Sequence, residues 1–206
     1  MLPGEPCGVN SMVHFDYRTA ETLPDLLALY NKEDGACLVA GGTEIVINLK
    51  KELISPRMLI DISPIEELQG IREEGGWICI GACTTHAQIS RSPLLLGEYP
   101  FLVEAVLNIG AEQTRSLATI GGNICAAVPC ADTAPPLLVA GARFLLKSVD
   151  GERLVPIDSF FLGPRQTVLA PNEVLAEIRI PGKAGGRGKF IKIGRRRALS
   201  LAVASI

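Results

Sequence analysis

Two short segments pair adjacent glycines with polar neighbours, a pattern that could bind phosphate. The first is Leu38-Val39-Ala40-Gly41-Gly42-Thr43-Glu44-Ile45, and the second is Thr119-Ile120-Gly121-Gly122-Asn123. Glycine lets a backbone turn sharply and approach a ligand, and successive amides at such a turn can form a nest for an anion. Two such loops could hold the two phosphates of a pyrophosphate from opposite sides.

These segments are not one of the common nucleotide motifs. Neither has the Gly-x-Gly-x-x-Gly spacing of a Rossmann fold, and neither ends in the Gly-Lys-Ser/Thr of a P-loop. A single Gly-Gly pair is most often a tight turn, whereas two pairs with polar residues at matching positions favour a binding role. The pattern alone leaves both readings open.

The elements around these segments predict an α+β fold with two subdomains. Helices and short strands alternate early in the chain, and antiparallel hairpins dominate later. A buried strand over 36–40 should lead into a helix over 43–50, whose N-terminus would favour phosphate. Residues 117–125 are predicted as a strand–glycine–strand unit. Asp132 is predicted to cap a helix that runs to Gly141.

The composition excludes several classes of protein. Hydrophobic residues make up 48% of the 206 residues, which supports a sizeable core. Lys and Arg (20) nearly balance Asp and Glu (22), so nothing in the charge favours nucleic-acid binding. Residues 1–10 show no signal peptide, and no apolar stretch approaches the ~20 residues that span a bilayer. We therefore expect a cytoplasmic protein.

The six cysteines do not form a metal-binding pattern. Cys79 and Cys83 fall on a predicted strand, about 13 Å apart and too distant to share one ion. Cys125 and Cys130 are five residues apart and have no second pair at zinc spacing. We expect reduced, mostly buried thiols and no metal site.

The motifs together resemble the FAD-binding medium subunit of molybdenum hydroxylases, the family of xanthine dehydrogenase, aldehyde oxidoreductase and carbon monoxide dehydrogenase. The resemblance rests on Val39–Glu44, Gln113–Ile124 and Asp132–Pro136. Supporting segments lie at 81–89, 173–181 and 190–198, so the resemblance extends from about Val13 to the end of the chain.

The resemblance implies a two-subdomain FAD-binding fold of the vanillyl-alcohol-oxidase (PCMH) type, with FAD between the subdomains. The expected division is an N-terminal tail over 1–12, FAD-binding subdomain 1 over 13–65 and FAD-binding subdomain 2 over 66–195. Residues 196–206 would begin a truncated C-terminal region, because the family continues there into a smaller domain.

The resemblance also implies a set of cofactor-binding residues and no catalytic residue. Asp132 would accept a hydrogen bond from a sugar or chain hydroxyl of FAD, and Lys192 would place a positive charge near the flavin. Ile109 stands where the family often has an aromatic residue, and Leu175 would pack on the flavin or adenine side. The full set is Leu38, Val39, Ala40, Gly41, Gly42, Thr43, Glu44, Ile45, Ile109, Thr119, Ile120, Gly121, Gly122, Asn123, Asp132, Leu175 and Lys192.

Three of these residues also have ordinary structural interpretations, and one further residue suggests a different chemistry. Asp132 could act only as a helix cap, Leu175 only as core, and Lys192 only as a solvated strand lysine. His86 could in principle attach FAD covalently, but its segment is ordinary in a family whose FAD is non-covalent.

The implied function is electron transfer. A molybdenum-cofactor large subunit would oxidise the substrate, a [2Fe-2S] small subunit would carry electrons to this FAD, and NAD+ or another acceptor would receive them. Alternatives are a free-standing flavin oxidase with its own substrate and a truncated, non-catalytic module. The chain offers no convincing acid–base pair for the first alternative.

Overall fold

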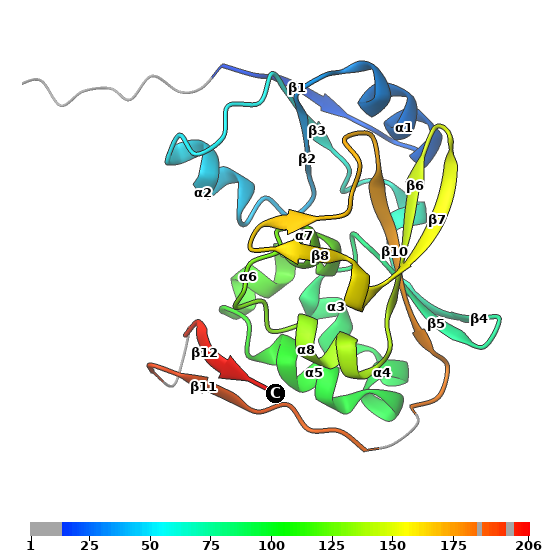
Figure 1. Ribbon diagram of the computed structural model, residues 1–206, viewed down its shortest axis with the longest axis vertical. Coiled ribbons are helices and arrows are strands. Elements are labelled where there is room, and N and C mark those ends of the chain that lie inside the picture. Colours follow the sequence, from blue (N-terminus) through cyan, green and yellow to red (C-terminus); the bar gives the residue numbers. More distant parts are fainter. Residues whose placement is uncertain (1–13, 185–186, 197–199) are drawn as a thin grey trace, which may run out of the picture.

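The computed structural model describes residues 14–184, 187–196 and 200–206, and the expected N-terminal tail lies outside them. Its first unit is a three-stranded parallel sheet of order β1-β3-β2 (Figure 1). The strands are β1 (Asp16–Thr19), β2 (Ala36–Val39) and β3 (Met58–Asp61), joined through α1 (Leu23–Lys32) and α2 (Ile45–Lys50). The chain therefore leaves β2 at a sheet edge and enters α2 directly through the first glycine pair.

Local sequence explains α1 well. The Thr22 side chain caps it by accepting a hydrogen bond from the Asp25 amide at 3.3 Å, and Pro24 lies in the first turn, where it is tolerated. Leu23 and Leu26 are its buried residues. By contrast, α2 has six residues and no side-chain cap, so its own dipole is small.

The second unit is a five-stranded antiparallel sheet of order β4-β5-β10-β6-β7. One face carries Ile78, Ile80, Phe144, Leu146 and Ile178 under a layer of short helices. The strands are β4 (Ile71–Glu74), β5 (Trp77–Gly81), β6 (Arg143–Ser148), β7 (Gly151–Pro156) and β10 (Val174–Pro181). The helices are α3 (His86–Arg91), α4 (Pro93–Glu98), α5 (Pro100–Leu107), α6 (Glu112–Leu117), α7 (Ile120–Cys125) and α8 (Ala134–Val139).

Two small hairpins complete the described chain, together with the 3-10 turns Glu66–Leu68 and Ile157–Ser159. β8 (Phe161–Gly163) pairs with β9 (Gln166–Thr167), and β11 (Lys192–Gly194) pairs with β12 (Ala202–Ser205). Figure 1 shows the β8–β9 hairpin lying over α7, and the β11–β12 hairpin beside the helical layer.

Two hydrophobic clusters form the core. The larger one lies between the five-stranded sheet and its helices, and the smaller one lies under α1 and the parallel sheet. The smaller cluster also takes Leu68, Cys83, Val174 and Ala176 from the second half of the fold. The two units are therefore packed together through β10 and the end of β5. Residues at the junction contact both units.

Three local expectations were wrong. The strand–glycine–strand unit over 117–125 is instead the end of α6 followed by α7. Asp132 does not cap α8, whose N-cap is Thr133 without a side-chain cap bond. The wholly apolar strand β2 is half-buried rather than buried, because it lies at the edge of its sheet.

Among the described residues, no helix is long and apolar enough to cross a membrane, and no group of three or more His, Cys, Asp or Glu side chains could hold a metal ion.

Candidate functional site

The first glycine loop (residues 38–45) presents a run of free backbone amides. Within the described chain, the amides of residues 41–45 donate no hydrogen bond, although Val46 N and Asn48 N do donate to Gly42 and Glu44 carbonyls. Gly42 has φ +69°, a conformation that glycine adopts without strain. The loop is half-buried, so these amides can meet a ligand from outside the protein. Amides in this arrangement could form the anion nest that the sequence predicts.

In the second glycine segment (residues 119–123), the amides of residues 120–123 all donate hydrogen bonds within the fold. Thr119 caps α7 by accepting a hydrogen bond from Gly122 N at 3.1 Å, and the Ile120 amide donates to Thr84 O. Gly121 N donates to Ala82 O at 2.8 Å, and a Cβ on Gly121 would lie 2.6 Å from that oxygen. The diglycine therefore allows α7 to pack closely against the end of β5. The expected second nest of free amides is not present.

The two glycine segments nevertheless meet. A Cβ on Gly41 would lie 1.8 Å from the Leu117 carbonyl oxygen and 3.1 Å from the Ala118 Cα. Gly41 thus touches the backbone that leads directly into Thr119. The two segments are therefore in direct contact, and the run of free amides lies on the first.

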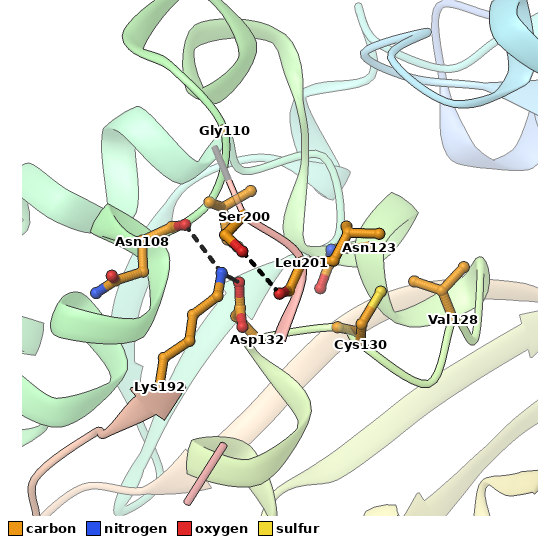
Figure 2. A pocket seen from close by; sticks show the side chains of 11 residues that line it. Asn108, Gly110, Asn123, Val128, Cys130, Asp132, Lys192, Ser200 and Leu201 are labelled. Atoms are coloured by element: carbon orange, nitrogen blue, oxygen red, sulfur yellow. Dashed lines mark hydrogen bonds and ion pairs between the residues drawn. The ribbon is translucent and has the colours of Figure 1, made fainter. Parts of the chain in front are cut away.

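A cavity of about 210 Å³ lies between the helical layer and β11, and Asn123 of the second glycine segment is one of its lining residues. Figure 2 shows the Lys192 ammonium between the Asn108 carbonyl and the Asp132 carboxylate. Lys192 Nζ lies 2.6 Å from Asp132 Oδ2 and 3.3 Å from Asn108 O. The lining residues are Asn108, Ile109, Gly110, Asn123, Val128, Cys130, Ala131, Asp132, Lys192, Ser200 and Leu201.

Asp132, one of the residues that line this cavity, has a buried carboxylate oxygen without a hydrogen-bond donor. Its residue is 6% exposed, and its Oδ1 atom is buried without a hydrogen-bond partner. Burial raises the pKa of the Asp132 carboxyl, and the hydrogen bond and charge of Lys192 oppose that rise. An orphaned carboxylate oxygen in a cavity is costly unless a ligand donor meets it.

Asn123 and Ile109 also reach the cavity. The Thr133 hydroxyl donates to Asn123 Oδ1 at 2.5 Å, which fixes the orientation of the side-chain amide. Ile109 is half-buried in the wall, and its carbonyl accepts from Arg115 Nη1 at 3.0 Å. The same guanidinium nitrogen also donates to Gly110 O, so Arg115 holds the turn that carries Ile109.

Leu175 is not brought to this cavity. It is 4% exposed on β10 and belongs to the larger core cluster. Its structural interpretation accounts for it fully, and we leave it out of the site proposed below.

His86 has no route to a covalent bond with a ligand. The residue is fully buried, and both ring nitrogens lack partners. Burial, and secondarily the positive charge of Arg115, lowers the pKa of His86 to about 4. A neutral, enclosed imidazole fits a core position, not an attachment site.

Several residues at the first glycine loop and at the cavity were not predicted from the sequence. Arg165, at the tip of the β8–β9 hairpin, places Nη1 2.7 Å from Glu44 Oε1 of the first glycine loop. Asn108 contributes a carbonyl, and Cys130 lines the cavity. Only tertiary structure reveals Arg165, since 121 residues separate it from Glu44.

Comparison with known proteins decides the family. Residues 13–183 match the model of the FAD-binding domain in molybdopterin dehydrogenases. The chain belongs to this family. The resemblance drawn from the glycine segments is thus confirmed.

Curated relatives agree with the family model. The chain is 39% identical over 175 residues to the carbon monoxide dehydrogenase medium chain of Hydrogenophaga pseudoflava, covering 84% of this chain and 61% of that relative. It is 36% identical over 166 residues to a xanthine dehydrogenase FAD-binding subunit of Escherichia coli O157:H7, covering 80% of this chain and 57% of that relative. The chain spans less than two thirds of these relatives' lengths.

Solved structures share this family's fold. Carbon monoxide dehydrogenase from H. pseudoflava lacking the Mo-pyranopterin moiety aligns with a TM-score of 0.88 and 37% identity, over 93% of this chain and 67% of that one. Quinoline 2-oxidoreductase from Pseudomonas putida 86 aligns with a TM-score of 0.90 and 25% identity, over 95% of this chain and 68% of that one. The mixed α/β architecture is therefore that of this FAD-binding domain.

Proposed function

We propose that this chain holds FAD and relays electrons as the flavin subunit of a molybdenum hydroxylase complex. Its partners would be a molybdenum-cofactor large subunit and a [2Fe-2S] small subunit, with NAD+ or another molecule as acceptor. Two relatives are named as a medium chain and as an FAD-binding subunit, which supports this assignment. Bound FAD would supply the exchange between two-electron and one-electron transfer, and the protein would position it and tune its potential.

The single observation that carries the proposal is the run of free amides over residues 41–45. A pyrophosphate needs several N–H donors without competing partners, and an exposed glycine loop can supply them. The FAD-binding family model covers this loop. We infer that residues 38–45 hold the pyrophosphate.

The other predicted residues take different roles in the proposal. Ile120, Gly121 and Gly122 would shape the binding site instead of donating amides, because their amides are used within the fold, and Thr119 would cap α7 beside them. Asp132 would accept a donor group of FAD at its orphaned Oδ1 atom. Asn123, Ile109 and Lys192 would line the same ligand along the cavity.

Lys192 would act as half of an ion pair in this site. Its ammonium is largely neutralised by Asp132 at 2.6 Å, so the charge felt by a bound flavin is that of the pair. The negative member of the pair is the one with an unused hydrogen-bonding atom. Lys192 would therefore offset Asp132 as well as face the cofactor.

The domain organisation remains part of the proposal. We infer a vanillyl-alcohol-oxidase (PCMH)-type division with FAD between subdomain 1 (13–65) and subdomain 2 (66–195), and residues 196–206 leading toward a further C-terminal region. The separate parallel and antiparallel sheets support two subdomains. The contact of Gly41 with Leu117 supports a ligand groove at their junction.

Two alternatives remain to be tested against this proposal. A free-standing flavin oxidase would need a base beside its substrate, and the ionisable residues lining the cavity are Cys130, Asp132 and Lys192, of which the last two are paired. A non-catalytic module would bind no flavin. Co-purification with molybdenum and iron–sulfur subunits would distinguish the first alternative, and the flavin absorption spectrum would distinguish the second.

The test of cofactor binding is a matched pair of variants at Gly42. A Cβ there meets nothing closer than 3.6 Å, and Asn and Asp tolerate positive φ better than other side chains. Gly42→Asp places a carboxylate beside the amides and should abolish FAD retention, whereas Gly42→Asn has nearly the same shape and should retain it. FAD binding by wild-type chain is measured by absorption and by quenching of flavin fluorescence.

Equal FAD retention by both Gly42 variants would refute the pyrophosphate site. Gly121→Asp is not a useful test, because its Cβ would collide with Ala82 and disturb the packing of α7 whatever its charge.

A further inference from the structure

The first glycine loop contains a negative charge where an anion should bind. Glu44 follows directly after Gly42 and Thr43, within the run of free amides. Its side chain is 37% exposed, so water does not fully screen it. An isolated carboxylate in this position would repel a pyrophosphate by the same electrostatics that draw the amides toward it.

A side chain from the other half of the fold pairs with this carboxylate. Arg165 Nη1 donates to Glu44 Oε1 at 2.7 Å. Arg165 lies at the tip of the β8–β9 hairpin. Its backbone amide donates a hydrogen bond to Ala127 O at 2.8 Å. The hairpin tip thus contacts both the first glycine loop and the turn that follows α7.

The backbone at this contact is unusual. Arg165 has φ +58° and Ala127 has φ +46°, two of the three non-glycine residues with positive φ in the described chain. Glycine would adopt this conformation more cheaply than arginine. Retaining a large side chain in a strained position is expected where that side chain has a function.

We propose that Arg165 neutralises Glu44 so that the first glycine loop can accept the diphosphate of FAD. This inference rests on the proposed function, because it takes the loop as the pyrophosphate site. Arg165 is a positioning residue for charge: it changes the potential at the amides through Glu44 and is not required to touch the ligand.

The alternative electrostatic role predicts a different result. If Arg165 bound a phosphate directly, its loss would weaken FAD binding whether or not Glu44 were charged. If it neutralises Glu44, its loss should matter only while Glu44 is charged. A double-mutant cycle separates the two roles.

The experiment measures FAD dissociation constants by fluorescence titration for the 206-residue chain and five variants. The Arg165 side chain is 59% exposed, so Arg165→Met should weaken FAD binding by no more than about fivefold at low salt. The effect should be smaller at high salt, because exposed charges are screened over about 10 Å at 0.1 M. The Glu44→Gln/Arg165→Met double variant should bind FAD about fivefold more tightly than Arg165→Met, because no unpaired carboxylate remains beside the amides, and Glu44→Gln completes the cycle. Arg91→Met is the matched control, since it removes an arginine from the exposed Arg91–Glu112 pair with the same change in net charge.

Arg165→Gly protects the test against misfolding. It removes the side chain but suits the positive φ, so it should weaken FAD binding as Arg165→Met does while keeping the wild-type melting temperature. Unchanged FAD affinity in Arg165→Met, a double variant as weak as Arg165→Met, or an equal loss in Arg91→Met would each overturn the inference. Failure of the wild-type chain to bind FAD would instead refute the proposed function.

Discussion

Lys192→Met should expose how much the Lys192–Asp132 pair stabilises the fold. The two side chains are 10% and 7% exposed, and their charged atoms lie 2.6 Å apart. Removing one partner of a buried pair costs about 3–5 kcal/mol, because the remaining charge is left without compensation. This pair borders a cavity, so we expect a value of about 3 kcal/mol.

The expected loss is large enough to measure in the ligand-free chain. For a domain of this size, each kcal/mol lowers the melting temperature by roughly 2–4 °C, so Lys192→Met should melt about 6–12 °C lower. Urea denaturation at pH 7 gives the free energy directly. The double variant Asp132→Asn/Lys192→Met should recover most of the loss, because it buries no unpaired charge.

The pH dependence gives an independent check. Burial alone would raise the pKa of Asp132 in Lys192→Met, since the opposing effect of Lys192 is gone. A carboxyl whose pKa is higher in the folded than in the unfolded chain binds more protons when folded, so stability increases as the pH falls toward the folded-state value. The deficit relative to wild type should therefore shrink between pH 7 and pH 5. A deficit below about 1 kcal/mol, or one that is equal at both pH values, would refute the buried-pair reasoning.

Three further variants test the burial of His86 and the close packing of the first glycine loop. The pKa of His86 is lowered to about 4 in the folded chain, so the unfolded chain takes up a proton at this residue more readily. Wild type should therefore lose about 2 kcal/mol of unfolding free energy between pH 7 and pH 5. His86→Leu should lose this pH dependence in urea titrations, and an equal fall with pH in both proteins would contradict the prediction. Gly41→Ala should lower the unfolding free energy by about 3 kcal/mol in thermal melts, because its Cβ meets Leu117 O. Gly42→Ala should lower it by only about 1–2 kcal/mol, the cost of a left-handed backbone conformation for alanine. Equal losses would contradict the close approach of Gly41 to Leu117.

Local signals predicted the elements that local forces determine. The Thr22 cap and the leucine spacing are enough to indicate α1, and the Asp150-Gly151 turn is enough to indicate the β6–β7 hairpin. The apolar run over 58–62 likewise indicates β3. These features depend on interactions between residues that are close in sequence. Such interactions can be inferred from the sequence without knowledge of the tertiary structure.

The errors occurred where distant contacts decide. A strand–glycine–strand unit was predicted over 117–125, but Gly121 lets the backbone approach Ala82 closely, and a helix forms there instead. Asp132 looked like a cap, yet its carboxylate pairs with Lys192, 60 residues away. Arg165 gave no signal, because nothing near it in sequence points to Glu44.

The candidate site was predicted in part for the same reason. The first glycine loop is a contiguous segment, so its residues and its geometry could be inferred together. The cavity gathers Ile109, Asn123, Asp132 and Lys192 from four separate places, and the family resemblance rather than any spacing brought them together.

The Lys192–Asp132 pair also fastens the β11–β12 hairpin to the helical layer, since Lys192 belongs to β11 and Asp132 precedes α8. A molecule that donates to the orphaned Asp132 oxygen would thereby share an anchor with this last hairpin. Linkage makes the effect mutual: a ligand that stabilises the anchor shifts the equilibrium toward the attached hairpin, and detachment of the hairpin lowers the affinity for that ligand by the same factor. Binding of such a ligand at Asp132 and attachment of the β11–β12 hairpin to the helical layer would therefore be coupled.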